Sequence, residues 1–256
     1  MADSRGQLRR ELVLTFPRPA GVRNVKLVAN AATGFWGAQM IRAMLALHGR
    51  EVDAWYATLD GNPGVRALLH AWNLREELYA LKLELEEPTG WEVRGILPGG
   101  GPVLAEDRVI PLDVSRALGD RLRIRLRPPA GFWALNSFGM EYGVDAPVSV
   151  TRVAPVEARD SQDVNVLAEL LAADDQYQMM AHVGEQVQLV FPAPAPRDGM
   201  ERTVFLHSRG YYRLHLVEGG EPDRSTLQQI ANTPDGPVRF AADRFGEWRS
   251  SRHQER

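Results

Sequence analysis

The chain has 256 residues, of which 44% are hydrophobic and 25% are charged, a balance typical of globular proteins with a packed core. Its formal net charge of -3 supplies no overall basic excess for non-specific nucleic-acid binding, which depends on neutralising phosphates. Because cysteine is absent, disulfides, thiolate metal sites and cysteine nucleophiles are excluded. We expect one large domain or two of ordinary size, with no nucleic-acid partner.

Short segments of strand-like alternation recur through the first 145 residues and are separated by turn signals rich in glycine and proline. Among them, the arginines at alternate positions of 121–127 are interpreted as the solvent face of a strand. Short strands at this spacing predict a mainly β fold over residues 8–145, an antiparallel β-sandwich of the jelly-roll or galactose-binding-like type. The expected strands are residues 11–16, 24–30, 79–85, 91–97, 108–114, 122–126 and 134–142.

A helical insertion is expected to interrupt this sandwich at residues 36–78. Apolar side chains recur there at helical spacing, and Asn62 followed by Pro63 predicts the start of a helix. Trp55 and Trp72 within the insertion are expected to pack it onto the sheet or onto a second copy of the chain. The second possibility predicts a homodimer formed through residues 36–78.

Residues 146–256 predict a smaller β-rich segment with a short helical tail, either packed on the same sheets or forming its own domain. Residues 154–162 are polar and typical of a linker, and 192–199 is a proline-rich connector. Asp223 or Ser225 is expected to cap the tail's first helix. The expected elements are strands 148–153, 185–191, 203–207 and 211–217, and helices 164–173, 227–231 and 240–248.

No apolar run approaches the roughly 20 residues that a membrane-spanning helix needs, so no membrane span is expected. The first ten residues are polar and contain no apolar signal-peptide segment. These features predict a cytoplasmic protein, or an extracytoplasmic one if the sequence is a fragment of a longer exported protein.

The residue types that carry catalysis or bind metals do not stand at the required spacings. No serine lies in a Gly-x-Ser-x-Gly elbow, and no phosphate-loop motif follows Gly99–Gly101. His207 and His215 would lie on opposite faces of a hairpin, or about 26 Å apart along one strand at roughly 3.3 Å per residue. The acidic residues between 157 and 175 lack the spacing of a calcium loop and are interpreted as a solvated face. We therefore expect no metal and no cofactor.

Aromatic side chains in expected loops are the best candidates for ligand binding. The string Gly-Phe-Trp occurs at 34–36 and again at 131–133, and two tyrosines flank a third turn. Planar rings on loops can stack on sugars or on a protein partner, although tryptophan and phenylalanine are more often core residues. The candidate ligand-binding residues are Phe35, Trp36, Phe132, Trp133, Tyr211 and Tyr212.

Two stretches resemble a known family. The first combines the pair Asp174-Asp175, the strand-like run 184–191, and the run 199–206 that leads to Gly210-Tyr211-Tyr212. The second is 121–142. Together they resemble the C-terminal accessory region of bacterial proteins with FG-GAP propeller repeats and a UnbV/ASPIC region, relatives of vertebrate cartilage acidic protein. The resemblance covers about half the chain and implies a non-catalytic accessory sandwich, without supplying a ligand or a site residue.

The leading functional hypothesis is a non-enzymatic module that recognises a carbohydrate or a protein partner. A hydrolase acting on a sugar is the first alternative, and it would need two carboxylates roughly 5–10 Å apart across a cleft. A structural homo-oligomer subunit is the second alternative. The candidate carboxylates of the hydrolase hypothesis are Glu84, Glu92, Glu141 and Asp175.

Overall fold

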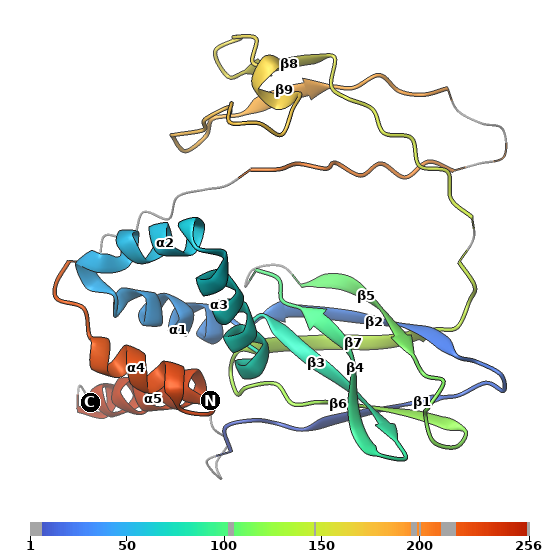
Figure 1. Ribbon diagram of the computed structural model, residues 1–256, viewed down its shortest axis with the longest axis vertical. Coiled ribbons are helices and arrows are strands. Elements are labelled where there is room, and N and C mark those ends of the chain that lie inside the picture. The colour runs from blue at the N-terminus through green and yellow to red at the C-terminus, as the bar shows by residue number, and fades with distance from the viewer. Residues whose placement is uncertain are drawn as a thin grey trace. The chain divides into compact units, whose positions relative to one another are not determined.

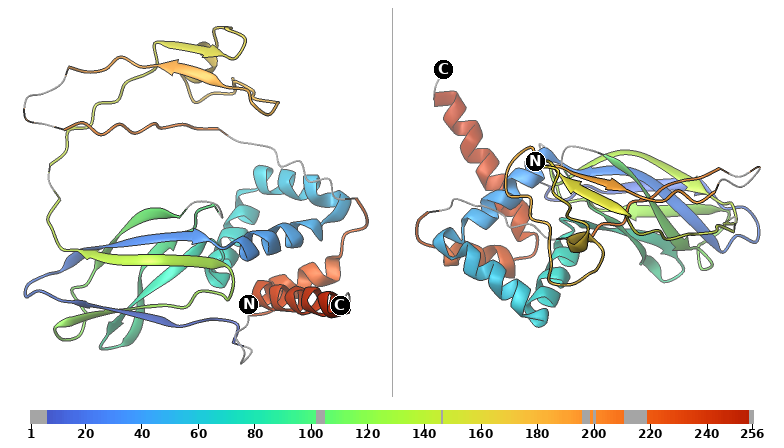
Figure 2. Two further views of the ribbon diagram at one scale, coloured as in Figure 1. Left: turned by 180° about the vertical axis from the view of Figure 1, so that it is seen from behind. Right: turned by 90° about the horizontal axis from the view of Figure 1, so that it is seen from above.

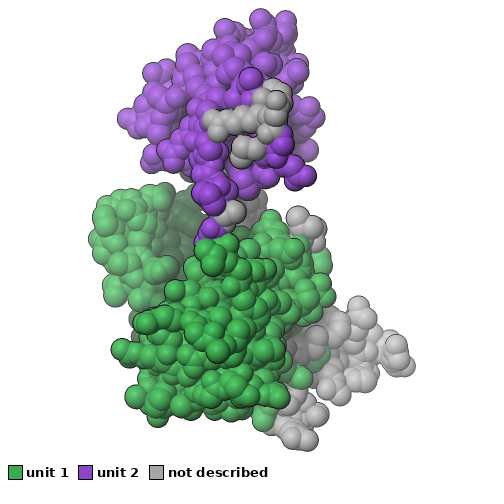
Figure 3. All heavy atoms as spheres, turned by 90° about the vertical axis from the view of Figure 1, so that its right-hand side faces the viewer, with its two compact units in different colours: residues 1–144, 216–256 green, residues 145–215 purple. Residues whose placement is uncertain are grey.

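The computed structural model describes residues 7–101, 105–145, 147–195, 199, 201–210 and 219–254 (Figure 1). In this part of the chain the fold is mainly antiparallel β-sheet, with nine strands in three sheets and five α-helices, which include a C-terminal pair. The predicted fold class, a β-sandwich with a helical insertion and a helical tail, is confirmed. The chain divides into two compact units, residues 1–144 with 216–256 and residues 145–215 (Figure 3).

Two antiparallel sheets form the sandwich of the first unit. The four-stranded sheet has the order β1 (Leu12–Pro17), β6 (Arg121–Leu126), β3 (Ala80–Glu87) and β4 (Gly90–Pro98). The three-stranded sheet has the order β5 (Glu106–Asp113), β2 (Asn24–Thr33) and β7 (Trp133–Glu141). Because side chains alternate between faces, each strand turns its apolar set inward, and Leu27, Leu83 and Leu122 are fully buried in the shared core.

The helices gather at one end of this sandwich (Figure 2). The insertion contains α1 (Phe35–Ala46), the short 3-10 helix η1 (Gly49–Glu51), α2 (Val52–Gly61) and α3 (Pro63–Glu76). The tail contains α4 (Arg224–Asn232) and α5 (Gly236–Gln254). A second hydrophobic cluster joins the two groups of helices to the sandwich, with Met40 of α1, Ile230 of α4 and Phe132 of the β6–β7 connection among its buried members.

Local capping signals in the sequence correspond to the observed helix starts. The Asn62 side chain accepts hydrogen bonds from the backbone of Gly64 and Val65, with proline in the first turn of α3. Of the two expected caps of α4, Asp223 fills the role and accepts from the backbone N–H of Thr226 at 3.0 Å. These polar side chains satisfy N–H groups that a helix start leaves without an internal partner.

In its described residues, the second unit contains little regular structure. Its sheet has two strands, β8 (Glu157–Asp160) and β9 (Val187–Val190), and η2 (Ala168–Leu170) is a single 3-10 turn. The predictions of strands at 148–153 and 203–207 and of a full helix at 164–173 were wrong, and β8 falls within the expected linker 154–162. Alternation alone forms no ladder when no partner strand lies alongside. The expected strand 211–217 lies outside the described residues.

Contacts also divide the chain differently from the expected division at residue 145. The boundary between the units falls after Val144, but the helical tail returns to the first unit, where α5 packs on α1 and α4. Among the residues that the structure describes, no helix combines the length and the apolar character needed to cross a membrane.

Candidate functional site

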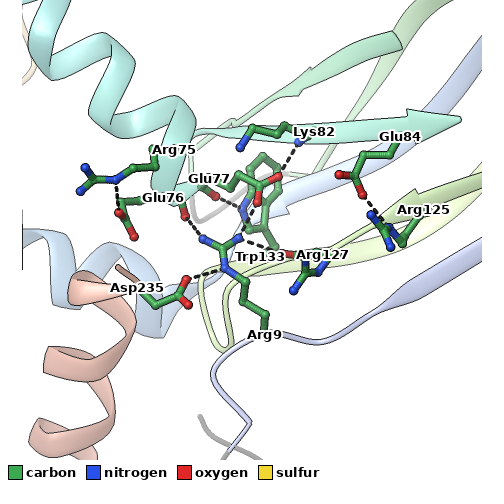
Figure 4. A network of polar contacts seen from close by, with 10 residues as sticks. All are labelled: Arg9, Arg75, Glu76, Glu77, Lys82, Glu84, Arg125, Arg127, Trp133 and Asp235. Atoms are coloured by element: carbon green, nitrogen blue, oxygen red, sulfur yellow. Dashed lines mark hydrogen bonds and ion pairs between the residues drawn. The ribbon is translucent and has the colours of Figure 1, made fainter. Parts of the chain in front are cut away.

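A hollow of about 280 Å³ lies where the helices meet the sandwich, and we call it the junction pocket. Helix α3 ends beside it, strand β3 begins beside it, and the N-terminal segment and the α4–α5 turn complete its walls (Figure 4). Its wall is strongly polar and carries both signs of charge. The lining residues are Arg9, Arg75, Glu76, Glu77, Lys82, Glu84, Arg127, Pro234 and Asp235.

Glu77 shapes the wall through its backbone. It terminates α3 in the left-handed region, with a φ of 59°, which is uncommon for a residue with a side chain. Its carboxylate accepts from the guanidinium of Arg9 and from the backbone N–H of Lys82 at 2.8 Å, and its carbonyl accepts from the Trp133 indole at 2.7 Å. These contacts hold the strained residue in place and direct the chain from α3 into β3.

Arg9 is the centre of the polar network in Figure 4. Its guanidinium pairs with Glu77 and also with Asp235, where the Nε–Oδ1 distance is 2.5 Å. It donates in addition to the carbonyls of Glu76 at 3.1 Å and Arg127 at 3.0 Å. One largely buried side chain therefore ties the N-terminal segment to the insertion, the β6–β7 connection and the C-terminal helices.

Arg75 and Glu76 complete the helical side of the junction pocket. The Glu76 side chain is almost fully buried, and its Oε1 accepts from Arg75 Nε at 2.6 Å, while its Oε2 has no hydrogen-bond partner among the described residues. Arg75 also donates to the carbonyl of Ala231 at the end of α4, at 2.8 Å. The last turn of α3 is thereby joined to the tail by a second arginine.

A row of charged side chains leads from the junction pocket along the outer face of the four-stranded sheet. Arg125 pairs with Glu84 and Arg123 pairs with Glu86, each at 2.6 Å. The guanidinium carbons of Arg125 and Arg123 also lie 4.6 Å and 5.6 Å from the ring centroid of Trp91 on β4. The interpretation of the arginines as the solvent face of a strand is confirmed, because Leu122, Ile124 and Leu126 between them are buried.

The two Gly-Phe-Trp strings lie side by side. Gly34 N–H donates to the carbonyl of Phe132 at 2.8 Å, and Gly37 N–H donates to the carbonyl of Gly131 at 3.1 Å. A Cβ at Gly37 would lie 2.6 Å from the Cα of Phe132. The approach of the two backbones therefore requires glycine at this position of α1.

Most of the aromatic side chains of these strings pack in or against the hydrophobic core and do not face solvent. Phe132 is fully buried, and Trp36 and Trp133 pack against the second hydrophobic cluster. Phe35 is 72% exposed. A ligand arriving from solvent could therefore reach Phe35 but not Phe132 in this structure. The remaining candidates, Tyr211 and Tyr212, lie outside the described residues.

The two tryptophans of the insertion lie in different environments. Trp72 of α3 packs against the second hydrophobic cluster, as expected of a residue that joins the insertion to the rest of the unit. Trp55 of α2 stacks on His48, with ring centroids 4.6 Å apart. Burial lowers the pKa of His48 below its usual value of 6.5, while Glu51 nearby opposes this effect.

The carboxylates considered for sugar hydrolysis are distributed over the chain. Glu84 and Glu92 belong to the four-stranded sheet, Glu141 belongs to the three-stranded sheet, and Asp175 belongs to the second unit. Glu84 is also neutralised by its arginine partner. In the part of the chain that the structure describes, no group of three or more His, Asp or Glu side chains could hold a metal ion.

Sequence reasoning missed most residues of the junction pocket, and it considered Glu84 only as a carboxylate for sugar hydrolysis and Arg127 only as part of a strand's solvent face. The alternating arginines of 121–127 have a complement of opposite charge in Glu84 and Glu86, which also stand at alternate positions. Only the register of β3 against β6 shows which of these side chains meet. No sequence signal joins Arg9 to Asp235, which are 226 positions apart.

The fold and these contacts define a mainly β protein, a seven-stranded antiparallel sandwich with a helical end and a second, sparsely structured unit. The chain matches no protein-family model, no curated protein and no solved structure.

Proposed function

We propose that this chain is a non-enzymatic binding or assembly module that engages a protein partner through residues 145–215. The observation that carries the proposal is the distribution of exposed apolar side chains. Of the 23 large hydrophobic side chains that are exposed among the described residues, 16 lie in this second unit. They include Val204, Phe205 and Leu206, which are 81%, 87% and 67% exposed.

The second unit also lacks a core of its own in the part that the structure describes. Its buried hydrophobic residues there are Ala158 and Val166. An isolated two-stranded sheet is marginally stable at best in water, because it buries too little apolar surface to offset its ordering. Exposed apolar surface of this extent is typical of protein interaction sites. A bound partner would therefore stabilise the unit by covering these side chains.

An open strand edge favours a partner that contributes extended backbone. In the described residues, β8 lies between β9 and residues 164–166, where Arg159 bridges Asn165, while β9 pairs with no strand other than β8. An added strand would satisfy free N–H and C=O groups at an edge and would seat side chains on the apolar face. The proposed partner is thus a protein that offers an extended segment.

The geometry supports a protein partner better than a carbohydrate. Sugar recognition was expected from aromatic rings on loop tips, and Phe35 is the one strongly exposed ring of the four in the two Gly-Phe-Trp strings. The resemblance to the accessory region of FG-GAP and UnbV/ASPIC proteins supports a non-catalytic module. We also propose that the sandwich is of the jelly-roll or galactose-binding-like type. A homodimer through residues 36–78 remains a further proposal.

The proposal is tested by placing a photo-crosslinking amino acid at Phe205 of the full chain in the cells that produce it. We expect one discrete covalent adduct with another protein. The same amino acid at Val109, an exposed apolar position on β5, is the matched control and should give no such adduct. Crosslinks from position 205 confined to residues 7–144 of the same chain would contradict the proposal, because the first unit would then cover the apolar side chains.

A further inference from the structure

The strands at the margins of the sandwich differ in how their free edges are protected. In the described residues, the marginal strands are β1 and β4 of one sheet and β5 and β7 of the other. Exposed edges are commonly guarded by charged residues, proline or bulges, which disfavour pairing with another chain. Strand β5 carries Asp107 and Pro111, β4 carries Glu92, and β7 has a bulge where Asn136 lacks a partner on β2. Residues 12–16 of β1, Leu-Val-Leu-Thr-Phe, have none of these features.

The backbone of β1 offers hydrogen-bonding groups at this unguarded edge. The N–H groups of Arg10 and Arg18, at the two ends of the strand, donate at 3.1 Å and 2.8 Å to carbonyls of the segment that contains β6. Only alternate residues of an antiparallel strand bond the same neighbour, so the even-numbered residues face β6. Val13 and Thr15 therefore direct their N–H and C=O groups away from β6, where no other strand pairs with β1 in the part of the chain that the structure describes.

The apolar side chains of β1 are also incompletely covered. Leu14 and Phe16 stand opposite Ile124 and Leu122, which are buried, so all four side chains point toward the shared core. Leu14 and Phe16 nevertheless stay only partly buried against that core. A further strand beside β1 would cover more of these two side chains and would satisfy the free backbone groups, and both effects favour pairing.

We propose that β1 pairs with β1 of a second copy of this chain, antiparallel and about a two-fold axis that passes beside Leu14. In this register Leu12 of each copy stands opposite Phe16 of the other, so apolar side chains meet on the inner face. Val13 stands opposite Thr15, so β-branched side chains meet on the outer face. The four-stranded sheets of the two copies thereby become one continuous sheet.

Charges at the ends of β1 favour a second copy over an unrelated strand. In the proposed register, Glu11 of one copy stands opposite Pro17 of the other. Arg121 is the partner of Pro17 on β6, and it is exposed and without an ion pair among the described residues. Strands lie about 4.8 Å apart, so the two charged residues stand about 10 Å apart at the backbone, a span that their long side chains can close. The two-fold axis produces this contact twice.

The first test is sedimentation of the full chain at concentrations up to several hundred micromolar, where we expect a monomer–dimer equilibrium. Thr15→Pro removes an outward N–H of β1 and leaves the ladder with β6 intact. Because the lost hydrogen bond occurs twice across the axis, we expect this variant to weaken association by about tenfold or more. A chain that stays monomeric, or a dimer that Thr15→Pro leaves unchanged, would overturn the proposal.

Val109→Pro is the matched control on the opposite side of the sandwich. The Val114 N–H donates to the carbonyl of Arg23, so the even-numbered residues of β5 face β2 and Val109 directs its N–H to the free edge of β5. Pro111 already occupies such a position. Val109→Pro should leave the association unchanged, and equal weakening by both proline variants would count against the proposal.

A single cysteine tests the register, because the chain contains none of its own. In a dimer of Leu14→Cys, the two thiols would face each other across the axis in a non-hydrogen-bonded pair with a Cα separation of about 4.5 Å. Disulfides form at such separations, so mild oxidation should give a covalent dimer. Val109→Cys, at an exposed position of β5, is the control. Crosslinking of Leu14→Cys no faster than that of Val109→Cys would refute the register.

An exchange of charges tests the contact between Glu11 and Arg121. Glu11→Arg and Arg121→Glu should each weaken association, and the chain that carries both changes should regain it, because opposite charges meet again. A double variant that associates no better than the single variants would contradict the pairing. This contact lies in the first unit, so its outcome is independent of the partner proposed for residues 145–215 and of a homodimer through residues 36–78.

Discussion

Arg9 and Glu77 form a largely buried ion pair at the place where α3 ends, although the two residues are 68 positions apart in the sequence. Their side chains are 14% and 8% exposed. Both charges have left water, so each depends on the other and on the surrounding hydrogen bonds for its stability. The pair also determines how the N-terminal segment lies against the helical end of the first unit.

Replacing Arg9 by methionine should destabilise the first unit by about 3–5 kcal/mol, because Glu77 would be left buried without a counter-charge. Urea unfolding followed by tryptophan fluorescence measures this, since all six tryptophans lie in the first unit. Arg10→Met is the matched control, because that side chain is exposed and its loss should cost no more than about 0.5 kcal/mol. Equal losses of unfolding free energy in the two variants would show that the Arg9–Glu77 pair does not stabilise the first unit.

Gly37→Ala should destabilise the protein, although alanine is the better helix former. The new methyl group would meet the backbone of Phe132, which cannot move aside as a flexible side chain can, and we expect a loss of at least about 1–3 kcal/mol. Gly61→Ala at the end of α2 has open space around it and should be neutral or stabilising by up to about 1 kcal/mol. The same unfolding assay compares them, and similar values for both would disprove the close approach.

Phe132→Ala and Phe35→Ala separate packing from surface roles in the two Gly-Phe-Trp strings. Phe132 is fully buried, so its truncation should cost about 3–5 kcal/mol. Phe35 is exposed, and its truncation should change stability by no more than about 0.5 kcal/mol. The free energies of unfolding of the two variants provide the comparison. A large loss for Phe35→Ala would mean that this ring is covered in solution.

His48 should make the first unit less stable in mild acid. Burial lowers its pKa in the folded state, so the unfolded chain takes up a proton more readily as the pH falls below 6.5. Stability is therefore present above pH 6.5 and is lost as the pH falls toward the folded-state pKa. His48→Gln should show a smaller drop in melting temperature between pH 7.5 and pH 5 than the original chain does. His70→Gln, at an exposed position of α3, is the matched control.

Alternation predicted the strands of the sandwich because both of its sheets bury one face. The arginines of β6 and the leucines between them show this directly, since the exposed and buried positions follow the sequence pattern residue by residue. The same reasoning failed at 148–153 and 203–207, where the pattern is present but no partner strand lies alongside among the described residues. It also missed β8, whose sequence Glu-Ala-Arg-Asp looks like a linker.

The candidate site was harder to predict, because it depends on contacts between distant segments. Two identical strings suggested loop tips with exposed rings, and the structure brings them together but packs three of the four rings. The sequence suggested no role for Arg9, Glu77 or Lys82. Their importance follows from the register of β3 and from the place where α3 ends.

By itself the sequence determined the local features of the sandwich and its helices: the period of these elements, the Asn62 cap, a cap at Asp223 or Ser225, and the face on which the apolar side chains of the sandwich strands lie. These depend on neighbours a few residues apart. Only the tertiary structure decided that Arg9 meets Glu77 and Asp235 and that Glu84 stands opposite Arg125. Such pairings depend on strand register and on the packing of segments up to 226 positions apart, which local periodicity does not encode.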